Sequence, residues 1–174
     1  MKSVDNSYMM KPLLSFAKAN INEGDCIHIS DDNFVRKNLE VNKSIVQISG
    51  RKPKGLWYSL GCEWINWLEH EMPEWAKPQV NLLNVDYNKI LLIDTDDKFK
   101  DFETEYLQTE TDIDWKRVSE EYSGIEISPY FYEYRFPSQW YYGWDVASGC
   151  LWNADALRGP TLLANYNNTL KRYV

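Results

Sequence analysis

The chain has 174 residues, of which 44% are apolar, and a formal net charge of −7, which suits one domain, residues 1–174, with one core. No apolar run approaches the roughly 18 residues of a membrane span, and the acidity disfavours a protein that grips a nucleic-acid backbone electrostatically. Three separated cysteines, two histidines and no signal segment argue against a disulfide scaffold and a metal site, so we expect a cytoplasmic protein with reduced thiols.

Hydrophobic periodicity in the first half of the chain predicts short strands around one helix. Alternating apolar and polar residues mark the strands, as in Asp25–Ser30, where Ile27 and Ile29 share a face. Helical spacing places Trp64 and Trp67 on one face. The elements predicted here are an N-terminal arm at 1–20 with a short helix at 13–19, strands at 25–30, 44–49 and 55–59, a helical turn from Asp31-Asp32 to Leu39, a basic loop at 50–54, and a helix at 62–71 that Pro73 ends.

The second half predicts further strands and two helices. Residues 90–93 are a continuous apolar run, which is typical of a buried strand. Trp115, Val118 and Tyr122 have helical spacing, and Gly124 is a typical helix stop. The elements predicted here are a strand at 89–94, a helix at 97–107, a second helix from about 112–114 to Gly124, a strand at 125–128, paired or bulged strands through the aromatic segment 130–152, and a weakly patterned segment at 155–174.

Strands and helices are therefore intermixed without a regular β-α-β-α alternation. The sequence has no G-x-G-x-x-G and no Walker A lysine motif, which disfavours a Rossmann dinucleotide fold and a P-loop enzyme. We expect an α+β fold whose core is a split, mixed or antiparallel sheet with flanking helices.

Aromatic residues make up 15% of the chain, and they accompany small polar residues in three segments. The segments are Ile27-His-Ile-Ser30, Lys52-Pro-Lys-Gly-Leu-Trp-Tyr-Ser59 and Trp144-Asp-Val-Ala-Ser-Gly-Cys-Leu-Trp152. A strand with His-x-Ser, a strand with aromatic-x-Ser that leads into a helix, and a late carboxylate resemble the ADP-ribosyltransferase superfamily, in its diphtheria-toxin and poly-ADP-ribose-polymerase-like branch. The order G-L-W-x-S, W-x-x-W, Y-x-G-I-E-I and W-D-V-x-S is similar to small phage and bacterial members of that superfamily.

The resemblance implies that the protein uses NAD and implies which residues bind it. His28 would hold the adenosine ribose, with Ser30 beside it. Tyr58 would stack on the nicotinamide, or Trp57 if the strand register is shifted by one, and Ser59 would hold the nicotinamide ribose. The complete set of expected NAD-binding residues is His28, Ser30, Lys54, Gly55, Trp57, Tyr58, Ser59 and Trp64.

The resemblance also implies a catalytic carboxylate. Asp145 matches the acidic position, where the family more often has Glu, and Glu126 is the rival residue. Breaking the bond between ribose and nicotinamide develops positive charge on the ribose, as in glycoside hydrolysis, and a nearby carboxylate stabilises that charge. An aromatic face attracts the cationic nicotinamide ring, and the basic run Arg51-Lys52-Pro-Lys54 offers charge to the pyrophosphate.

We therefore expect an NAD-dependent mono-ADP-ribosyltransferase with a protein or nucleic-acid acceptor, in the manner of phage or bacterial toxins, defence factors or counter-defence factors. Two alternatives stay open. The chain is a non-catalytic binding module whose aromatic segment 130–144 forms the binding face, or it keeps the fold but has lost NAD activity. The candidates also have structural interpretations: Trp64 and Trp67 as core residues, Asp145 as a turn former, and the basic run as a solvated loop.

Overall fold

The structure, a computed structural model, describes residues 5–31 and 44–174. The chain forms two compact units, and each unit is assembled from separate stretches of sequence. The first unit comprises Met1–Glu40, Tyr58–Asn84 and Gly159–Val174. The second comprises Val41–Trp57 and Val85–Arg158. The boundary between the units therefore falls inside a strand, between the consecutive residues Trp57 and Tyr58.

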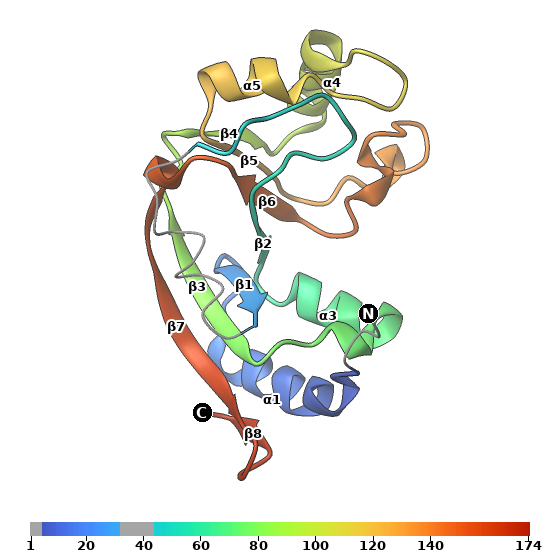
Figure 1. The fold of residues 1–174 in the computed structure, drawn as a ribbon. Helices are drawn as coiled ribbons and strands as arrows, with labels where there is room; N and C mark the ends of the chain where they lie inside the picture. Colours follow the sequence, from blue (N-terminus) through green and yellow to red (C-terminus); the bar gives the residue numbers. More distant parts are fainter. Residues whose placement is uncertain (1–4, 32–43) are drawn as a thin grey trace. The chain divides into compact units, whose positions relative to one another are not determined.

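The first unit consists of helices packed on antiparallel strands (Figure 1). Its strand order is β2-β1-β3-β7-β8, and the pairs β1–β2, β1–β3 and β7–β8 are antiparallel. The elements are η1 (Ser7–Met9), α1 (Met10–Asn20), β1 (Cys26–Ser30), the end of β2 (Leu56–Leu60), α3 (Glu63–Glu71), η2 (Pro73–Trp75), β3 (Gln79–Val85), β7 (Leu157–Asn167) and β8 (Arg172–Tyr173).

The core of the first unit lies between these helices and one face of the strands. Ile29 pairs with Val80 across β1 and β3, so both side chains point to the same face. Leu13 of α1 and Ile65 of α3 are fully buried there. Each such side chain contributes about 1.5–3 kcal/mol when it leaves water. The opposite face of β1 and β3 carries His28, Ser30, Gln79 and Asn81.

The second unit places two helices on one face of a mixed sheet (Figure 1). The strand order is β4-β5-β6-β2, with β4 parallel to β5 and β5 antiparallel to β6. Thr95 caps α4 and Asp114 caps α5 through their side chains. The elements are β4 (Ile90–Ile93), α4 (Asp96–Tyr106), α5 (Trp115–Glu121), β5 (Gly124–Ile127), η3 (Tyr132–Tyr134), η4 (Tyr141–Gly143), β6 (Ser148–Leu151) and η5 (Ala154–Ala156).

Aromatic side chains fill the core of the second unit. Phe99 stacks on Tyr134, with ring centroids 4.4 Å apart. The indole N–H of Trp115 donates to the Gly50 carbonyl at 2.9 Å, and that of Trp140 donates to Glu103 at 2.7 Å. A buried indole that has a hydrogen-bond partner adds a large apolar area without an unpaired polar atom. Much of the aromatic surplus of the sequence is therefore core material.

The predicted α+β class and the mixed sheet with flanking helices are confirmed. The structure has strands near the predicted positions 25–30, 55–59, 89–94 and 125–128, and the helix predicted at 13–19 belongs to the longer α1. The three other predicted helices correspond to α3, α4 and α5. The helical turn predicted to reach Leu39 lies outside the described residues. None of the helices in the described ranges combines the length and the apolar character that crossing a bilayer requires.

One strand prediction was wrong, one was right only in part, and three strands were not predicted. Residues 44–49 form a loop. The carbonyls of Ile45 and Lys54 and the N–H of Lys54 bond the side chain of Gln47, where in a sheet they would bond the backbone of a neighbouring strand. The segment 130–152, predicted as paired or bulged strands, contains the short 3-10 turns η3 and η4 and the single strand β6, and several rings of the part before β6 are buried in the core. The weakly patterned segment 155–174 holds β7 and β8, and β3 was not predicted.

Candidate functional site

The basic loop at 50–54 is held at both of its ends in the second unit. Gly50 exchanges backbone hydrogen bonds with Ile113, at 3.2 and 2.9 Å. The buried Gln47 amide donates to the Lys54 carbonyl at 2.8 Å and accepts from the Lys54 backbone N–H at 2.9 Å. The chain between these anchors has little freedom, so the position of Lys52 is defined by the fold.

Lys52 reaches back over the first residues of β2. Its Nζ atom lies 4.8 Å from the centre of the Trp57 ring, which is the geometry of a cation–π contact. The Trp57 ring in turn meets Trp144 edge to face, with centroids 4.9 Å apart. A side chain at Gly143 would come within 3.2 Å of Lys52 Cε. Glycine at this position therefore leaves room for the lysine.

Arg135 and Asp145 join the same group. The Arg135 guanidinium bonds the Asp145 carboxylate at 3.3 Å, and both side chains are about a quarter exposed. The guanidinium also lies over the ring of Tyr142, 5.4 Å from its centre. The Nε atom of Arg135 is buried and has no hydrogen-bond partner among the described residues. We call Lys52, Trp57, Arg135, Tyr142 and Asp145 the basic–aromatic cluster.

Electrostatics link the members of this cluster. Desolvation of the ammonium lowers the pKa of Lys52, and the carboxylate of Asp145 opposes that shift. Lys52 as a whole is an exposed residue. The cluster holds two cationic groups and one carboxylate, which leaves it with a positive charge in an acidic protein. Such a site favours an anionic ligand that also has a flat ring.

Glu126, the rival carboxylate, lies on the other face of the second unit's sheet. On β5 it stands between Ile125 and Ile127, which belong to the helix-facing core. Glu126 pairs with Gly149, whereas Ile125 pairs with the core residue Cys150, and side chains alternate along a strand. Glu126 is buried and accepts a hydrogen bond from the Tyr87 hydroxyl at 2.9 Å. Trp57, over whose ring Lys52 lies, packs against the helix-facing core, so the cluster with Asp145 is on the helix-facing side of the sheet and Glu126 is on the other.

In the first unit, the strand register brings three of the predicted NAD-binding residues to one face. Cys26 pairs with Leu60 and Ile27 with Ser59, so by alternation His28, Ser30 and Tyr58 point away from the helices. Asn81 lies opposite His28 and its amide donates to the Ser30 hydroxyl at 3.2 Å. Ser59 shares the face of Ile27, which is the helix-facing one. The structure therefore groups His28, Ser30 and Tyr58 and excludes Ser59 from that group.

The other predicted NAD-binding residues have different surroundings. Gly55 lies against β6, where a Cβ atom would approach the Leu151 carbonyl oxygen to 2.3 Å, so close strand packing accounts for this glycine. Lys54 is exposed and its backbone is held by Gln47. Trp64 stacks on Trp67 of the same helix, with centroids 4.7 Å apart. Trp57, the alternative to Tyr58 for a strand register shifted by one residue, belongs to the basic–aromatic cluster.

The aromatic face proposed for a binding module is mostly core. Trp140 and Tyr141 are fully buried, so they cannot form a binding surface. Three other rings of the same segment remain exposed: Tyr132, Phe136 and Tyr142. Arg135 and Gln47 were missed as site residues, because their grouping with Lys52 and Asp145 depends on loop geometry that periodicity does not reveal. Tyr142 was expected only on the binding face of the non-catalytic alternative.

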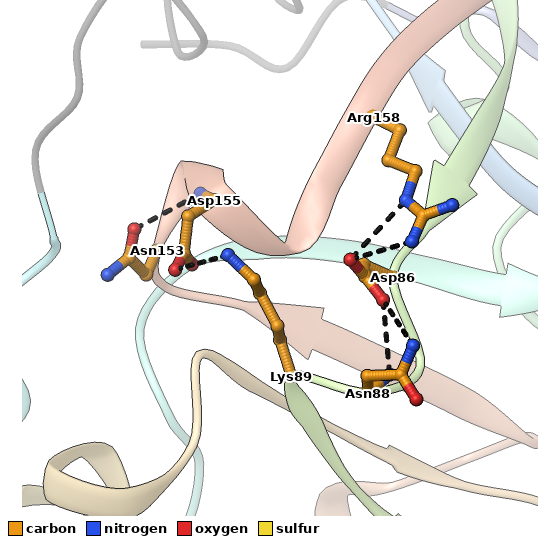
Figure 2. Close-up of polar contacts among 6 residues, drawn as sticks. All are labelled: Asp86, Asn88, Lys89, Asn153, Asp155 and Arg158. Carbon is orange, nitrogen blue, oxygen red and sulfur yellow. Dashed lines mark hydrogen bonds and ion pairs between the residues drawn. The ribbon is translucent and has the colours of Figure 1, made fainter.

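A separate polar network fixes the turn before β4 and the entry to β7 in the second unit (Figure 2). Arg158 bonds the Asp86 carboxylate through Nε at 3.3 Å and through an Nη atom at 2.9 Å. Lys89 pairs with Asp155 at 2.9 Å. Hydrogen bonds from Arg158 and then from Asn88 hold the pKa of Asp86 below its ordinary value. All these carboxylates have partners inside the network, which indicates a structural role.

Comparison of the chain with protein-family models, with curated proteins and with solved structures finds no match. Within residues 5–31 and 44–174, no group of three or more His, Cys, Asp or Glu side chains is arranged to hold a metal ion. The burial of Cys150 raises the pKa of its thiol, which keeps the thiol protonated and unreactive. The chemistry available to the protein therefore has to be argued from the clusters themselves.

Proposed function

We propose that the protein binds NAD and transfers its ADP-ribose to a macromolecular acceptor, with Asp145 as the catalytic carboxylate. One observation carries this proposal: Asp145 lies in a cluster with two cations and two aromatic rings, all within the second unit. These are the groups that a pyrophosphate, a cationic planar ring and a developing ribosyl cation need. Glu126 is the weaker candidate because it is buried on the opposite face and bonded to Tyr87.

The proposed reaction is a substitution at the anomeric carbon of the nicotinamide ribose. The bond from that carbon to nicotinamide breaks, and nicotinamide leaves as a neutral molecule with the bonding electron pair. The acceptor's nucleophile forms the new bond and gives up its proton to solvent or base. Lys52 and Arg135 would hold the pyrophosphate by charge-assisted hydrogen bonds, Tyr142 or Trp57 would face the nicotinamide, and Asp145 would stabilise the positive ribose.

The test is release of nicotinamide from NAD in the presence of cell lysate as the acceptor source. Asp145→Asn keeps the size of the side chain and removes its charge, and we expect a loss of activity of roughly 10²–10³-fold. Glu126→Gln is the matched comparison, and thermal melting of both variants checks that they fold. Wild type that neither binds NAD nor releases nicotinamide would refute the proposal. Loss of activity only in Glu126→Gln would move the catalytic role to the other face.

A binding module without catalysis is the second candidate. The observation that favours it is the exposure of Tyr132, Phe136 and Tyr142 beside Arg135, since rings next to a guanidinium suit base stacking. On this alternative, Tyr142→Ala weakens capture of a single-stranded oligonucleotide, while Asp145→Asn leaves it unchanged. The reverse dependence would exclude it.

A thermal-shift titration with NAD distinguishes the proposed enzyme from a protein that keeps the fold but no longer binds NAD. A ligand stabilises the folded state by RT ln(1 + [L]/Kd), which is about 2.7 kcal/mol at 100 times Kd. A melting temperature that does not move at millimolar NAD would support the inactive alternative.

A further inference from the structure

Three tryptophans form a continuous array on the surface of the first unit. Trp64 and Trp67 of α3 stack with their ring planes 13° apart and their centroids 4.7 Å apart. Trp75 of η2 continues the array, with its centroid 6.4 Å from that of Trp67. Trp75 is 46% exposed, and Trp64 and Trp67 are half-buried. From α3, Ile65 and Leu68 are buried in the core of this unit, and the half-buried Trp64 and Trp67 pack against that core.

The stretch of sequence that carries the array is acidic. Between Glu63 and Trp75 the sequence has four glutamates and no lysine or arginine. Glu63 and Glu71 stand four positions before and after Trp67, and residues at that spacing are neighbours on a helix surface. Glu74 directly precedes Trp75. A ring array surrounded by carboxylates offers both negative ring faces and negative charge to one ligand.

This combination selects a cationic occupant. An ammonium or guanidinium group over a tryptophan face gains cation–π attraction, and tryptophan is the best ring for that contact. The glutamates add long-range attraction and would repel an acidic partner. A neutral sugar would use the rings but gain nothing from four carboxylates. An uncharged apolar peptide would remove water from around those carboxylates without pairing them, and the desolvation of an unpaired charge is unfavourable.

We propose that Trp64, Trp67 and Trp75, with Glu71 and Glu74, form a docking surface for a lysine- or arginine-rich segment of a partner protein. This surface belongs wholly to the first unit and does not depend on the proposed NAD chemistry. It would bring a basic partner to the protein whatever reaction the second unit performs. The role of Trp64 on this inference is partner binding, in place of the NAD contact that the resemblance implied.

The test is fluorescence anisotropy with a short dye-labelled arginine-rich peptide at physiological salt. We expect Trp75→Ala to weaken binding about two- to fivefold, the range for a cation–π contact at an exposed site. Leu107→Ala, which removes an exposed apolar side chain of the second unit, is the control and should bind like wild type. Glu71→Gln should weaken binding, while Glu120→Gln, an equal charge change on α5, should not.

Two outcomes would overturn the inference. If Trp75→Ala and Glu71→Gln bind the peptide as tightly as their two controls, the attraction is only the net charge of the protein. If a neutral oligosaccharide displaces the peptide, and its own binding needs Trp75 but not Glu71, the array is a sugar platform. Thermal melting of each variant shows that the compared proteins are folded.

Discussion

The ammonium of Lys52 lies 4.8 Å from the centre of the Trp57 ring, although the loop that separates these residues contains a proline and a glycine. The loop is held at Gly50 and Lys54, so the lysine returns over the strand that follows it. Asp145 lies close enough to influence the Lys52 pKa. The contact is therefore the point where the basic loop, β2 and the turn after η4 meet in the second unit.

Lys52→Met is expected to weaken NAD binding. A hydrogen bond to a charged group contributes about 1.5–3 kcal/mol, so the affinity should fall at least about tenfold, with a smaller salt dependence than wild type. Isothermal titration with NAD at two salt concentrations measures both effects. Lys116→Met on α5, an exposed lysine outside the cluster, is the control. Equal affinities of the two variants would show that Lys52 does not contact the ligand.

Gly55→Ala is expected to destabilise the protein by about 1–3 kcal/mol, the usual cost of overpacking. The added Cβ would approach a backbone oxygen of Leu151 to 2.3 Å, and a backbone atom cannot move aside as a side chain can. Urea denaturation measures the change in the free energy of unfolding. Gly24→Ala is the control, because a Cβ there meets no atom within 4 Å. Similar midpoints for both variants would contradict the packing shown here.

Trp140→Ala is expected to cost about 3–5 kcal/mol of stability, as for other buried aromatic residues. The Trp140 side chain is fully buried and its N–H bonds Glu103 at 2.7 Å. Tyr142→Ala, two positions further on, removes a half-exposed ring and should change the unfolding free energy little. Thermal melting distinguishes the two variants. A Trp140→Ala variant as stable as wild type would contradict the burial of this side chain.

Acid should weaken the network of Figure 2. The pKa of Asp86 is held below its ordinary 3.8, first by hydrogen bonds from Arg158. The stabilisation is therefore present above about pH 4 and is lost as the pH falls through the lower, folded-state pKa. Arg158→Met should reduce the difference between urea midpoints at neutral pH and near pH 3, whereas Arg172→Met should not. An unchanged difference would mean that the pair does not affect stability.

Alkali should destabilise the protein through Tyr106. Burial, followed by the nearby carboxylates of Glu105 and Glu121, raises the pKa of Tyr106 to about 12. The unfolded chain, with a tyrosine pKa of about 10, loses this proton first, so stability falls as the pH rises from about 10 to about 12. Tyr106→Phe should reduce that fall, and the exposed Tyr132→Phe should not. Equilibrium unfolding at several pH values provides the measurement.

Sequence patterns predicted the regular elements well where one period dominated. The apolar run 90–93 and the spacing of Trp115 and Val118 are local signals, and both elements are present. The strand predicted at 44–49 failed because its hydrogen bonds go to the side chain of Gln47. Strand β7 was not predicted, because its sequence has neither a clear alternation of apolar and polar residues nor a continuous apolar run.

The candidate site was predictable only in its parts. Asp145 and Trp57 were named from short motifs, and they now lie in one cluster with Lys52. Arg135 carries no motif, and its approach to Asp145 comes from the turns η3 and η4. Ser59 was excluded by strand register, since a neighbouring residue on a strand faces the opposite way. Long-range register and loop closure are the information that local patterns lack.

The interleaving of the two units has a consequence for biosynthesis. The first unit needs residues from three stretches, the last of which is Gly159–Val174, whereas every residue of the second unit has been translated once Arg158 is made. All residues of the second unit are therefore synthesised before β8. The hydrophobic face of α1 can pack against β8 only after the last stretch of the chain has been made. Nascent chains arrested just after Arg158 has emerged should accordingly protect the second unit's tryptophans from protease while Leu13 and its neighbours stay cleavable.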